Sequence, residues 1–148
     1  MIIININISN EIKRFNHIIG EMNAVYHEIA LKMGLTDSAM SILYAIYSHG
    51  ESYPLQEICR FSGISKQTIN SAIRKLENED IVYLEQTNKK NKTVYLTEKG
   101  QRLAENTVSK IIKAENEIFE SWSKKDVEKY LILTEMYLDT LKEKANHI

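Results

Sequence analysis

Apolar residues recur at intervals of three and four along most of the chain, which predicts a mainly helical protein. From Asn10 to Met33 this spacing is continuous, and it indicates one long amphipathic helix. Gly34 follows as a helix stop, and Thr36 is a suitable N-cap for a second helix that extends to about His49. The first third of the chain therefore predicts two helices joined by a tight turn.

Two shorter helices are predicted next, with almost no chain between them. Pro54 suits the first turn of a third helix, and Gly63 supplies a left-handed residue that ends it. Ser65 is a natural N-cap for a fourth helix, which continues to about Glu79. Helices joined by so short a turn must cross steeply, so this segment predicts a helix-turn-helix.

The fourth predicted helix has one apolar and one polar face. The apolar stripe consists of Ile69, Ala72, Ile73 and Leu76. The opposite face has amide, hydroxyl and cationic groups without an acid, whereas an ordinary solvated face usually mixes Glu with Lys. Such groups hydrogen-bond to base edges and phosphates. The outer face consists of Lys66, Gln67, Asn70, Ser71, Arg74 and Lys75.

A β-hairpin is predicted after this helix. The segments 81–85 and 93–96 are rich in β-branched and aromatic residues, and the polar residues 88–92 join them. Asparagine is common in turns, so its presence in this segment is explained by the turn alone. Three lysines at one apex repel one another unless an anion lies nearby, so we favour a contact of the tip with phosphates or with a DNA minor groove.

Two further long helices are predicted, from Thr97 to about Trp122 and from Ser123 through Leu141. They exceed what the small helix-turn-helix core can cover, so we expect them to pack on a second copy of the chain. The fold class is therefore mainly α with a small β-hairpin wing, a winged helix-turn-helix with long N- and C-terminal dimerisation helices. We expect one domain over 1–148, with a DNA-binding lobe at 36–100 and dimerisation helices at 10–33 and 101–146.

Charge is distributed unevenly along the chain. The formal net charge is only -1, which by itself argues against a nucleic-acid partner. Residues 60–95, however, contain seven basic and four acidic residues, a local charge of +3 that leaves -4 for the remainder. This separation is expected if one part of the chain faces phosphates.

Several classes of protein are excluded or disfavoured. We expect no membrane segment and no signal peptide, since Met1 to Ile8 alternates isoleucine with asparagine, and we therefore expect a cytoplasmic protein. No phosphate loop, metal-ligand spacing or nucleophile with a base is evident, so we expect neither an enzyme nor a metal or cofactor site. Cys59 occupies a helix position typical of a small buried residue, and we favour that interpretation over a redox role.

A group of aromatic residues leaves two interpretations open. They are suited to line a pocket between the first, second and fifth predicted helices, but such residues are more often part of the core. The residues are Phe15, Tyr26, Tyr44, Tyr47 and Trp122.

The order of predicted elements resembles that of the multiple antibiotic resistance regulator (MarR) family of bacterial transcription factors. The resemblance extends over nearly the whole chain. Its local signatures are Leu35-Thr36 at the start of the second helix, residues 64–69 and 74–77 in the fourth helix, and residues 96–100 after the hairpin.

Two positions depart from the family pattern. The family usually has glycine where this chain has Asp80, a residue that also tolerates a left-handed backbone. Family wings commonly contain an Asp-x-Arg motif, whereas this wing offers lysines and no arginine. Lysine is a more strongly hydrated point charge, so we expect weaker readout of minor-groove shape.

The resemblance implies a homodimer that binds double-stranded DNA, as a repressor that a small-molecule effector releases. We expect Gln67, Asn70 and Ser71, with Thr68 as a further candidate, to contact base edges, and Arg74 to reach a guanine or a phosphate. A winged helix used only for protein–protein interaction is the alternative, but it would need exposed apolar anchors on the fourth helix. The full set of expected DNA-binding residues is Ser65, Lys66, Gln67, Thr68, Asn70, Ser71, Arg74, Lys75, Lys89, Lys90, Asn91 and Lys92.

Overall fold

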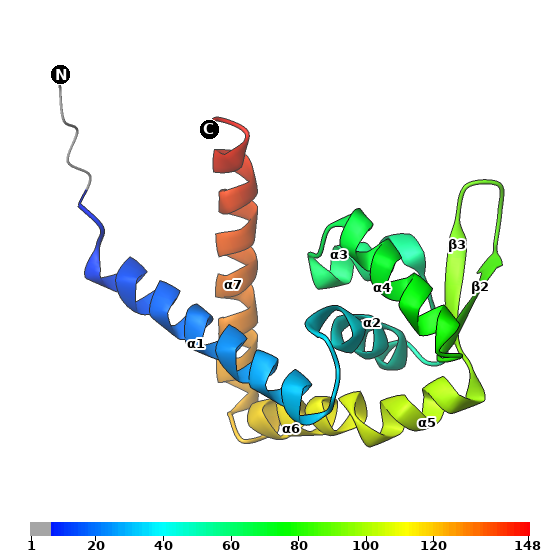
Figure 1. The fold of residues 1–148 in the computed structure, drawn as a ribbon. Helices are drawn as coiled ribbons and strands as arrows, with labels where there is room; N and C mark the ends of the chain where they lie inside the picture. Colours follow the sequence, from blue (N-terminus) through cyan, green and yellow to red (C-terminus); the bar gives the residue numbers. More distant parts are fainter. Residues whose placement is uncertain (1–6) are drawn as a thin grey trace.

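The structure, a computed structural model, describes residues 7–148 and has the predicted fold class (Figure 1). Residues 1–6, which include most of the apolar N-terminal stretch and the start of the predicted domain, lie outside the described part. The elements are α1 (Asn10–Lys32), α2 (Asp37–Ser48), β1 (Ser52–Pro54), α3 (Leu55–Ser62), α4 (Lys66–Asn78), β2 (Val82–Gln86), β3 (Lys92–Leu96), α5 (Glu98–Asn106), α6 (Val108–Glu120) and α7 (Lys124–Ala145).

The helix boundaries lie where the sequence places caps. Thr36 Oγ1 accepts a hydrogen bond from the Ala39 amide at 3.1 Å, and Ser65 Oγ accepts one from the Thr68 amide at 3.3 Å. Gly63 ends α3 with φ +67°, and Asp80 follows α4 with φ +60°. The left-handed turn expected at Asp80 is therefore confirmed.

The core surrounds α2, which lies at the centre of the lobe formed by residues 36–100 (Figure 1). Ile42, Leu43 and Ile46 on this helix are completely buried. They belong to one cluster with apolar side chains of α3, α4, the sheet, α5 and α6. This packing fixes α3 and α4 against each other, because both helices bury their apolar stripes in the same core.

The hairpin belongs to a three-stranded antiparallel sheet of order β1-β3-β2, which the sequence did not predict. The short strand β1 pairs with β3, with Tyr53 opposite Val94. Three residues ending in proline are too short to give a periodic signal, and proline is tolerated at a strand edge. The additional strand holds the base of the hairpin against the lobe.

The single helix predicted from Thr97 to Trp122 is wrong, since the chain breaks at Thr107 into α5 and α6. Thr107 has φ -126° and ψ -87°, and its hydroxyl donates to the Leu103 carbonyl at 2.7 Å. This hydrogen bond uses the carbonyl that a continuing helix would pair with the Thr107 amide. No glycine or proline marks the break, so the sequence pattern did not reveal it.

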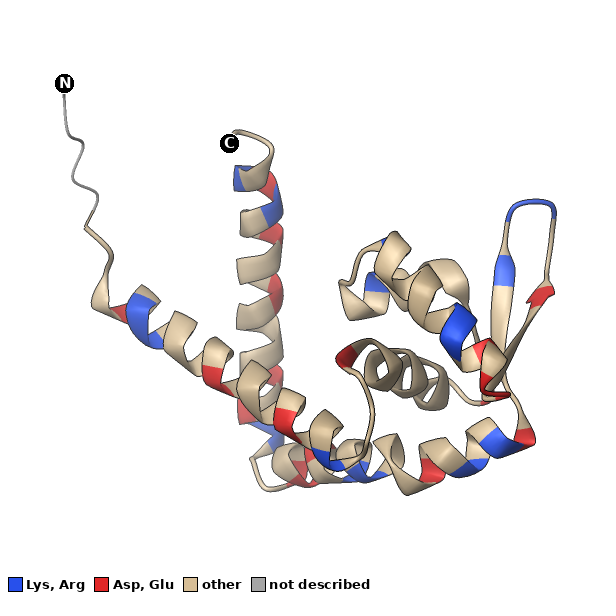
Figure 2. Ribbon diagram, viewed as in Figure 1, with Lys and Arg blue, Asp and Glu red and all other residues tan. Residues whose placement is uncertain are grey.

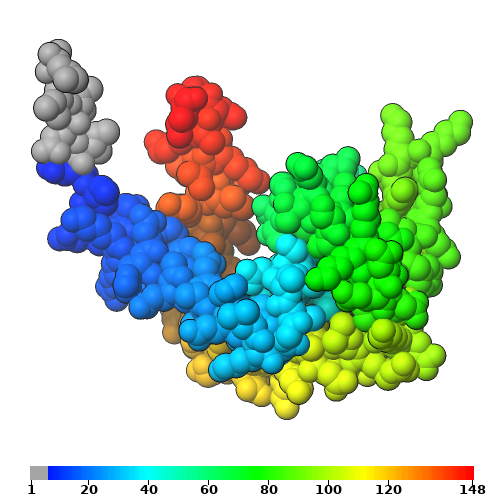
Figure 3. All heavy atoms as spheres, viewed as in Figure 1, coloured from blue at the N-terminus to red at the C-terminus, as the bar shows by residue number. Residues whose placement is uncertain are grey.

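Two long helices leave the lobe with their apolar faces exposed. The aromatic rings of Phe15 on α1 and Tyr137 on α7 approach within 5.0 Å between centroids, and α7 buries no residue. Figure 3 shows α7 and the N-terminal half of α1 standing away from the lobe. Within residues 7–148 no single helix is long and apolar enough to cross a membrane; α1 and α2 together meet that test, with a bend of 91°.

Candidate nucleic-acid interface

A groove of about 570 Å³ lies between α4, α3 and the hairpin. The hairpin, consisting of β2, β3 and the turn of residues 87–91, is called the wing below. Of the predicted DNA-binding residues, Lys66, Asn70 and Arg74 line the groove from α4, and Lys90, Asn91 and Lys92 line it from the wing. The fold thus brings together two sets of predicted DNA-binding residues that are distant in the sequence.

The groove is electropositive. Lys66, Arg74, Lys90 and Lys92 contribute four cations, and Glu77 contributes one acid. Figure 2 shows the basic residues at the wing tip and on α4, on one side of the lobe. Cations that line one concave surface reinforce each other's potential and favour a polyanionic partner.

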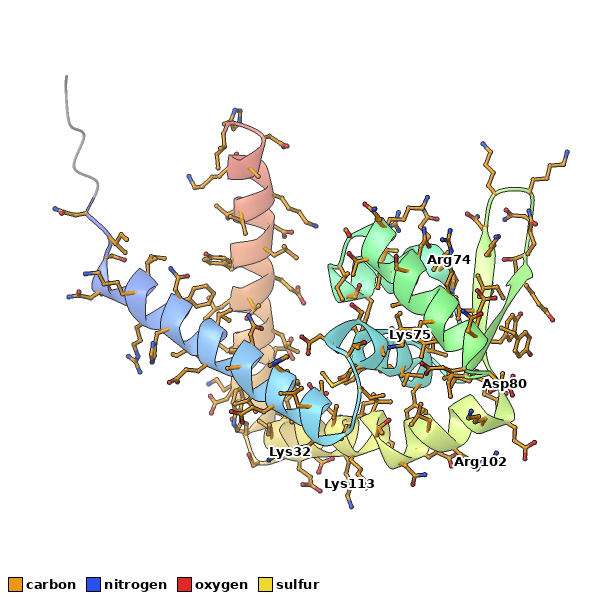
Figure 4. All side chains as sticks on the ribbon, in the orientation of Figure 1. Lys32, Arg74, Lys75, Asp80, Arg102 and Lys113 are labelled. Atoms are coloured by element: carbon orange, nitrogen blue, oxygen red, sulfur yellow. The ribbon has the colours of Figure 1, made fainter. Side chains whose placement is uncertain are left out.

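Other predicted residues lie on α4 outside this groove. Gln67, Ser71 and Lys75 are exposed but do not line it. Positions 67, 71 and 75 repeat every four residues, so they form a stripe beside the one at 66, 70 and 74. Helix α4 therefore has two polar stripes, of which one faces the wing; Figure 4 labels Arg74 and Lys75, one on each.

Ser65 and Thr68 have a structural task at the start of α4. Ser65 Oγ caps the helix and also donates to Thr68 Oγ1 at 2.9 Å. Both residues remain exposed. Their hydroxyl groups can still contact DNA, but their presence is explained by the helix cap alone.

The wing turn has a defined backbone. Asn88 Oδ1 accepts hydrogen bonds from the amides of Lys90 at 3.0 Å and Asn91 at 2.9 Å. The Thr87 amide donates to the Asn91 carbonyl at 2.9 Å. The turn therefore carries Lys89 and Lys90, both exposed, on a backbone that is hydrogen-bonded internally.

Sequence reasoning missed three polar residues in the groove. Gln56 and the half-buried Cys59 line it from α3, and Glu77 lines it from the end of α4. Glu77 is not among the expected DNA-binding residues, and Cys59 is expected from the sequence as a small buried residue. The α3 residues carry no local signal, because only the crossing of α3 and α4 turns them toward the wing.

Comparison with known proteins agrees with this architecture. Residues 33–90, which include α2, the helix-turn-helix and most of the wing, match the sequence model of the MarR family. Solved MarR-family structures match 88–97% of the chain. The chain is therefore similar in sequence to the MarR family over residues 33–90, and it has the fold of solved MarR-family structures. MarR proteins are transcriptional regulators rather than enzymes. No curated protein sequence matches the chain.

Three solved MarR-family structures illustrate the likeness of fold. NMB1585 from Neisseria meningitidis has a TM-score of 0.82 at 14% identity, covering 94% of this chain and 99% of its own. S. aureus MepR in its DNA-binding conformation has a TM-score of 0.75 at 19% identity, covering 90% and 99%. NadR in complex with 4-hydroxyphenylacetate has a TM-score of 0.65 at 18% identity, covering 95% and 97%.

The wing lysines give a prediction about salt. Lys90→Ala is expected to reduce the slope of log affinity for DNA against log salt concentration by about 1, because one phosphate contact releases about one counterion. The slope is measured by fluorescence anisotropy over a salt series. Lys113→Ala is the matched control, since Lys113 lies on α6 at the edge away from the wing turn (Figure 4). A wild-type slope in Lys90→Ala would reject the phosphate contact.

The aromatic residues considered as a possible pocket do not lie together in one place. Tyr47 packs on the core, Phe15 contacts α7, and Trp122 contacts Phe119 and Tyr130 near the α6–α7 turn. Tyr26 and Tyr44 meet at another site, where both hydroxyl groups donate to Glu115. The five residues therefore do not line one shared pocket. They are not all core residues either, since Tyr26 and Tyr44 bind a carboxylate.

The pairing of Tyr26 with Glu115 predicts a dependence on alkaline pH. Burial, with a smaller contribution from Glu115, raises the pKa of Tyr26 from 10.0 to about 12. Above pH 10 the unfolded chain loses this proton while the folded chain keeps it. The stabilisation is therefore complete below pH 10 and is lost as the pH rises toward 12.

Ultraviolet absorbance of phenolate measures this titration. We expect late-titrating tyrosine in the wild type, and we expect Tyr26→Phe to remove a late component. Tyr47→Phe, in which the deleted hydroxyl group is not bound to Glu115, should leave the late component in place. Loss of the same component in both variants would contradict the assignment.

Proposed function

We propose that this chain is a sequence-specific transcriptional repressor that binds a pseudo-palindromic operator as a homodimer and is released by a small ligand. The observation that carries the proposal is the electropositive groove between α4 and the wing. Its cations come from two separate segments and converge on one surface, as a phosphate backbone requires. S. aureus MepR, which has the same fold, is known in complex with DNA.

The homodimer is supported by the exposed apolar surface of α1, α6 and α7. On α7 the side chains of Tyr130, Leu131, Leu133 and Met136 are all at least 42% exposed. A helix of 22 residues that buries none of them in its own chain needs a partner surface. A second copy supplies the same surface and gives the two-fold symmetry that a palindromic site demands.

In this proposal the two polar stripes of α4 make different contacts with DNA. In this proposal α4 enters a major groove and the wing reaches the adjacent minor groove. Gln67 and Ser71, with Thr68 as a further candidate, then contact base edges, and Asn70 contacts them from the side facing the wing. Arg74 reaches a guanine or a phosphate. The phosphate contacts are Lys66, Lys75, Lys89, Lys90 and Lys92, and Ser65 and Asn91 lie close enough to add polar contacts.

Release by a ligand follows if one arrangement of the dimer binds DNA and another binds the ligand better. NadR, a protein of the same fold, is known in complex with 4-hydroxyphenylacetate. The effector of this chain is proposed only as a small molecule.

Selection of bound sequences from a random pool of double-stranded DNA tests the proposal. We expect a palindrome with half-sites about 10 bp apart, one helical turn of DNA. Light scattering of the free protein tests the dimer separately. Salt-sensitive binding without a consensus would reject sequence-specific regulation. Failure to bind DNA would instead favour a protein-interaction module, although the exposed residues of α4 are all polar.

A further inference from the structure

One carboxylate joins three helices at the boundary between the lobe and the long helices. The Tyr26 hydroxyl on α1 donates to Glu115 Oε2 at 2.5 Å, and the Tyr44 hydroxyl on α2 donates to Glu115 Oε1. Glu115 lies on α6, and all three side chains are half-buried. We call these residues the tyrosine clamp. Each carboxylate oxygen accepts a hydrogen bond, and hydrogen bonds to a charged acceptor are stronger than neutral ones.

Few other contacts hold α1 against the lobe. Ala30 is the only residue of α1 that is buried. Two residues after the end of α1 the backbone turns at Gly34, which has φ +69°. His27 Nδ1 lies 2.9 Å from both carboxylate oxygens of Asp37, but this pair is exposed and therefore screened by solvent. The angle between α1 and α2 thus depends strongly on contacts in the last turns of α1, where Tyr26 lies.

The clamp also contacts the helix-turn-helix. The ring of Tyr44 stacks on the ring of Phe61, with 5.8 Å between centroids and 28° between planes. Phe61 is in the last turn of α3, and α4 begins five residues later. Three side chains in succession, of which Phe61 is itself exposed, therefore lead from Glu115 on α6 to α3, the helix that precedes α4.

We infer that Glu115 is a positioning residue for DNA recognition, which through Tyr26 and Tyr44 sets the distance between the two recognition helices of the dimer. This inference rests on the proposed function. The exposed apolar faces of α1 and α7 belong to the dimer, whereas α4 belongs to the lobe, so the angle at the clamp determines where each α4 lies. Adjacent base pairs are about 3.4 Å apart, and a small rotation of the lobe therefore changes the half-site spacing that fits.

Operators of different half-site spacing test this role. Affinity is measured for the selected palindrome and for versions with one or two base pairs inserted or removed at the centre. The wild type is expected to prefer one spacing. In Glu115→Ala the ratio of affinities between the preferred and the altered spacing is expected to fall about fivefold or more, a typical size for coupling between distant sites.

The variants separate positioning from simple packing. Tyr26→Phe and Tyr44→Phe each delete one hydroxyl group and should lower the spacing ratio while the chain remains folded. Glu115→Gln should largely rescue it, because the amide can accept from one phenol and donate to the other. Tyr47→Phe, the matched control on α2, should retain the wild-type ratio. If Glu115→Ala does not fold, the two tyrosine variants decide the question.

A measurement without DNA keeps this inference distinct from the proposed function. Spin labels are attached at Glu79→Cys, at the end of α4, in a Cys59→Ser background, and the distance between the two subunits is measured. The clamp variants are expected to broaden or shift this distance. An unchanged distance would overturn the inference, and so would a changed distance with an unaltered spacing ratio. If the wild type binds no operator, the proposed function fails while the label distance still tests the clamp.

Discussion

Arg74→Ala is expected to weaken operator binding by about 1 to 3 kcal/mol, roughly 5- to 150-fold in Kd. Arg74 is exposed and lines the groove opposite the wing lysines, where it can reach a guanine edge or a phosphate. Its guanidinium has a planar set of donors, which lysine cannot reproduce. Gel shift or anisotropy at fixed salt measures the effect, and Arg74→Lys should recover only part of the loss.

Arg102→Ala is the matched control for this experiment. Arg102 lies on α5, away from the wing turn, and pairs with Glu98 at 3.1 Å on the exposed surface (Figure 4). Because it makes no contact with the groove, its loss should leave the operator affinity within error of the wild type. Equal losses in both variants would indicate a general charge effect, and an unchanged midpoint in Arg74→Ala would remove Arg74 from the interface.

Gly100→Ala is expected to destabilise the folded lobe by about 3 kcal/mol or more. Gly100 is buried in the first turn of α5, and a Cβ atom placed there would lie 2.0 Å from the Ile81 carbonyl oxygen. That carbonyl is already fixed, because it accepts from the Thr97 amide at 3.0 Å and from the Thr97 hydroxyl at 3.1 Å. Either α5 or the first residues of the wing must therefore move.

Chemical denaturation followed by circular dichroism measures this loss. Gly20→Ala is the matched control, since Gly20 also lies within a helix and a Cβ atom there meets nothing within 4 Å. Alanine favours a helix over glycine by about 1 kcal/mol, so the control should be neutral or stabilising. A Gly100→Ala variant as stable as the wild type would show that the Ile81 carbonyl can move freely.

The sequence predicted best those features that depend on one local residue. Thr36 and Ser65 accept the amide hydrogen bonds expected of N-caps, and Gly63 has the expected left-handed backbone. Both partners of an N-cap hydrogen bond lie within four residues of each other, so the local sequence is enough to predict it. The helix-turn-helix and the polar faces of α4 followed from these boundaries.

Features that depend on distant partners were missed. Strand β1 forms through pairing of Tyr53 with Val94. The clamp forms through the hydrogen bond between Tyr26 and Glu115, which are 89 residues apart in the sequence. Neither pairing leaves a periodic pattern in the sequence. The break at Thr107 was missed for a different reason, because threonine is compatible with a helix until its hydroxyl takes the Leu103 carbonyl. The two walls of the groove, α4 and the wing, were each predicted from local sequence. That they face each other follows only from the fold.

The internal hydrogen bonds of the wing turn have a thermodynamic consequence. Asn88 already holds the amides of Lys90 and Asn91, so the backbone loses little conformational freedom when the wing meets a phosphate. The entropic cost of docking falls mainly on the lysine side chains, each about 0.5 to 1.5 kcal/mol on immobilisation. Asn88→Gly would keep every cation but remove the side chain that holds the turn. The backbone of the turn would then lose more conformational entropy on binding DNA, and the binding entropy would be less favourable at the same charge.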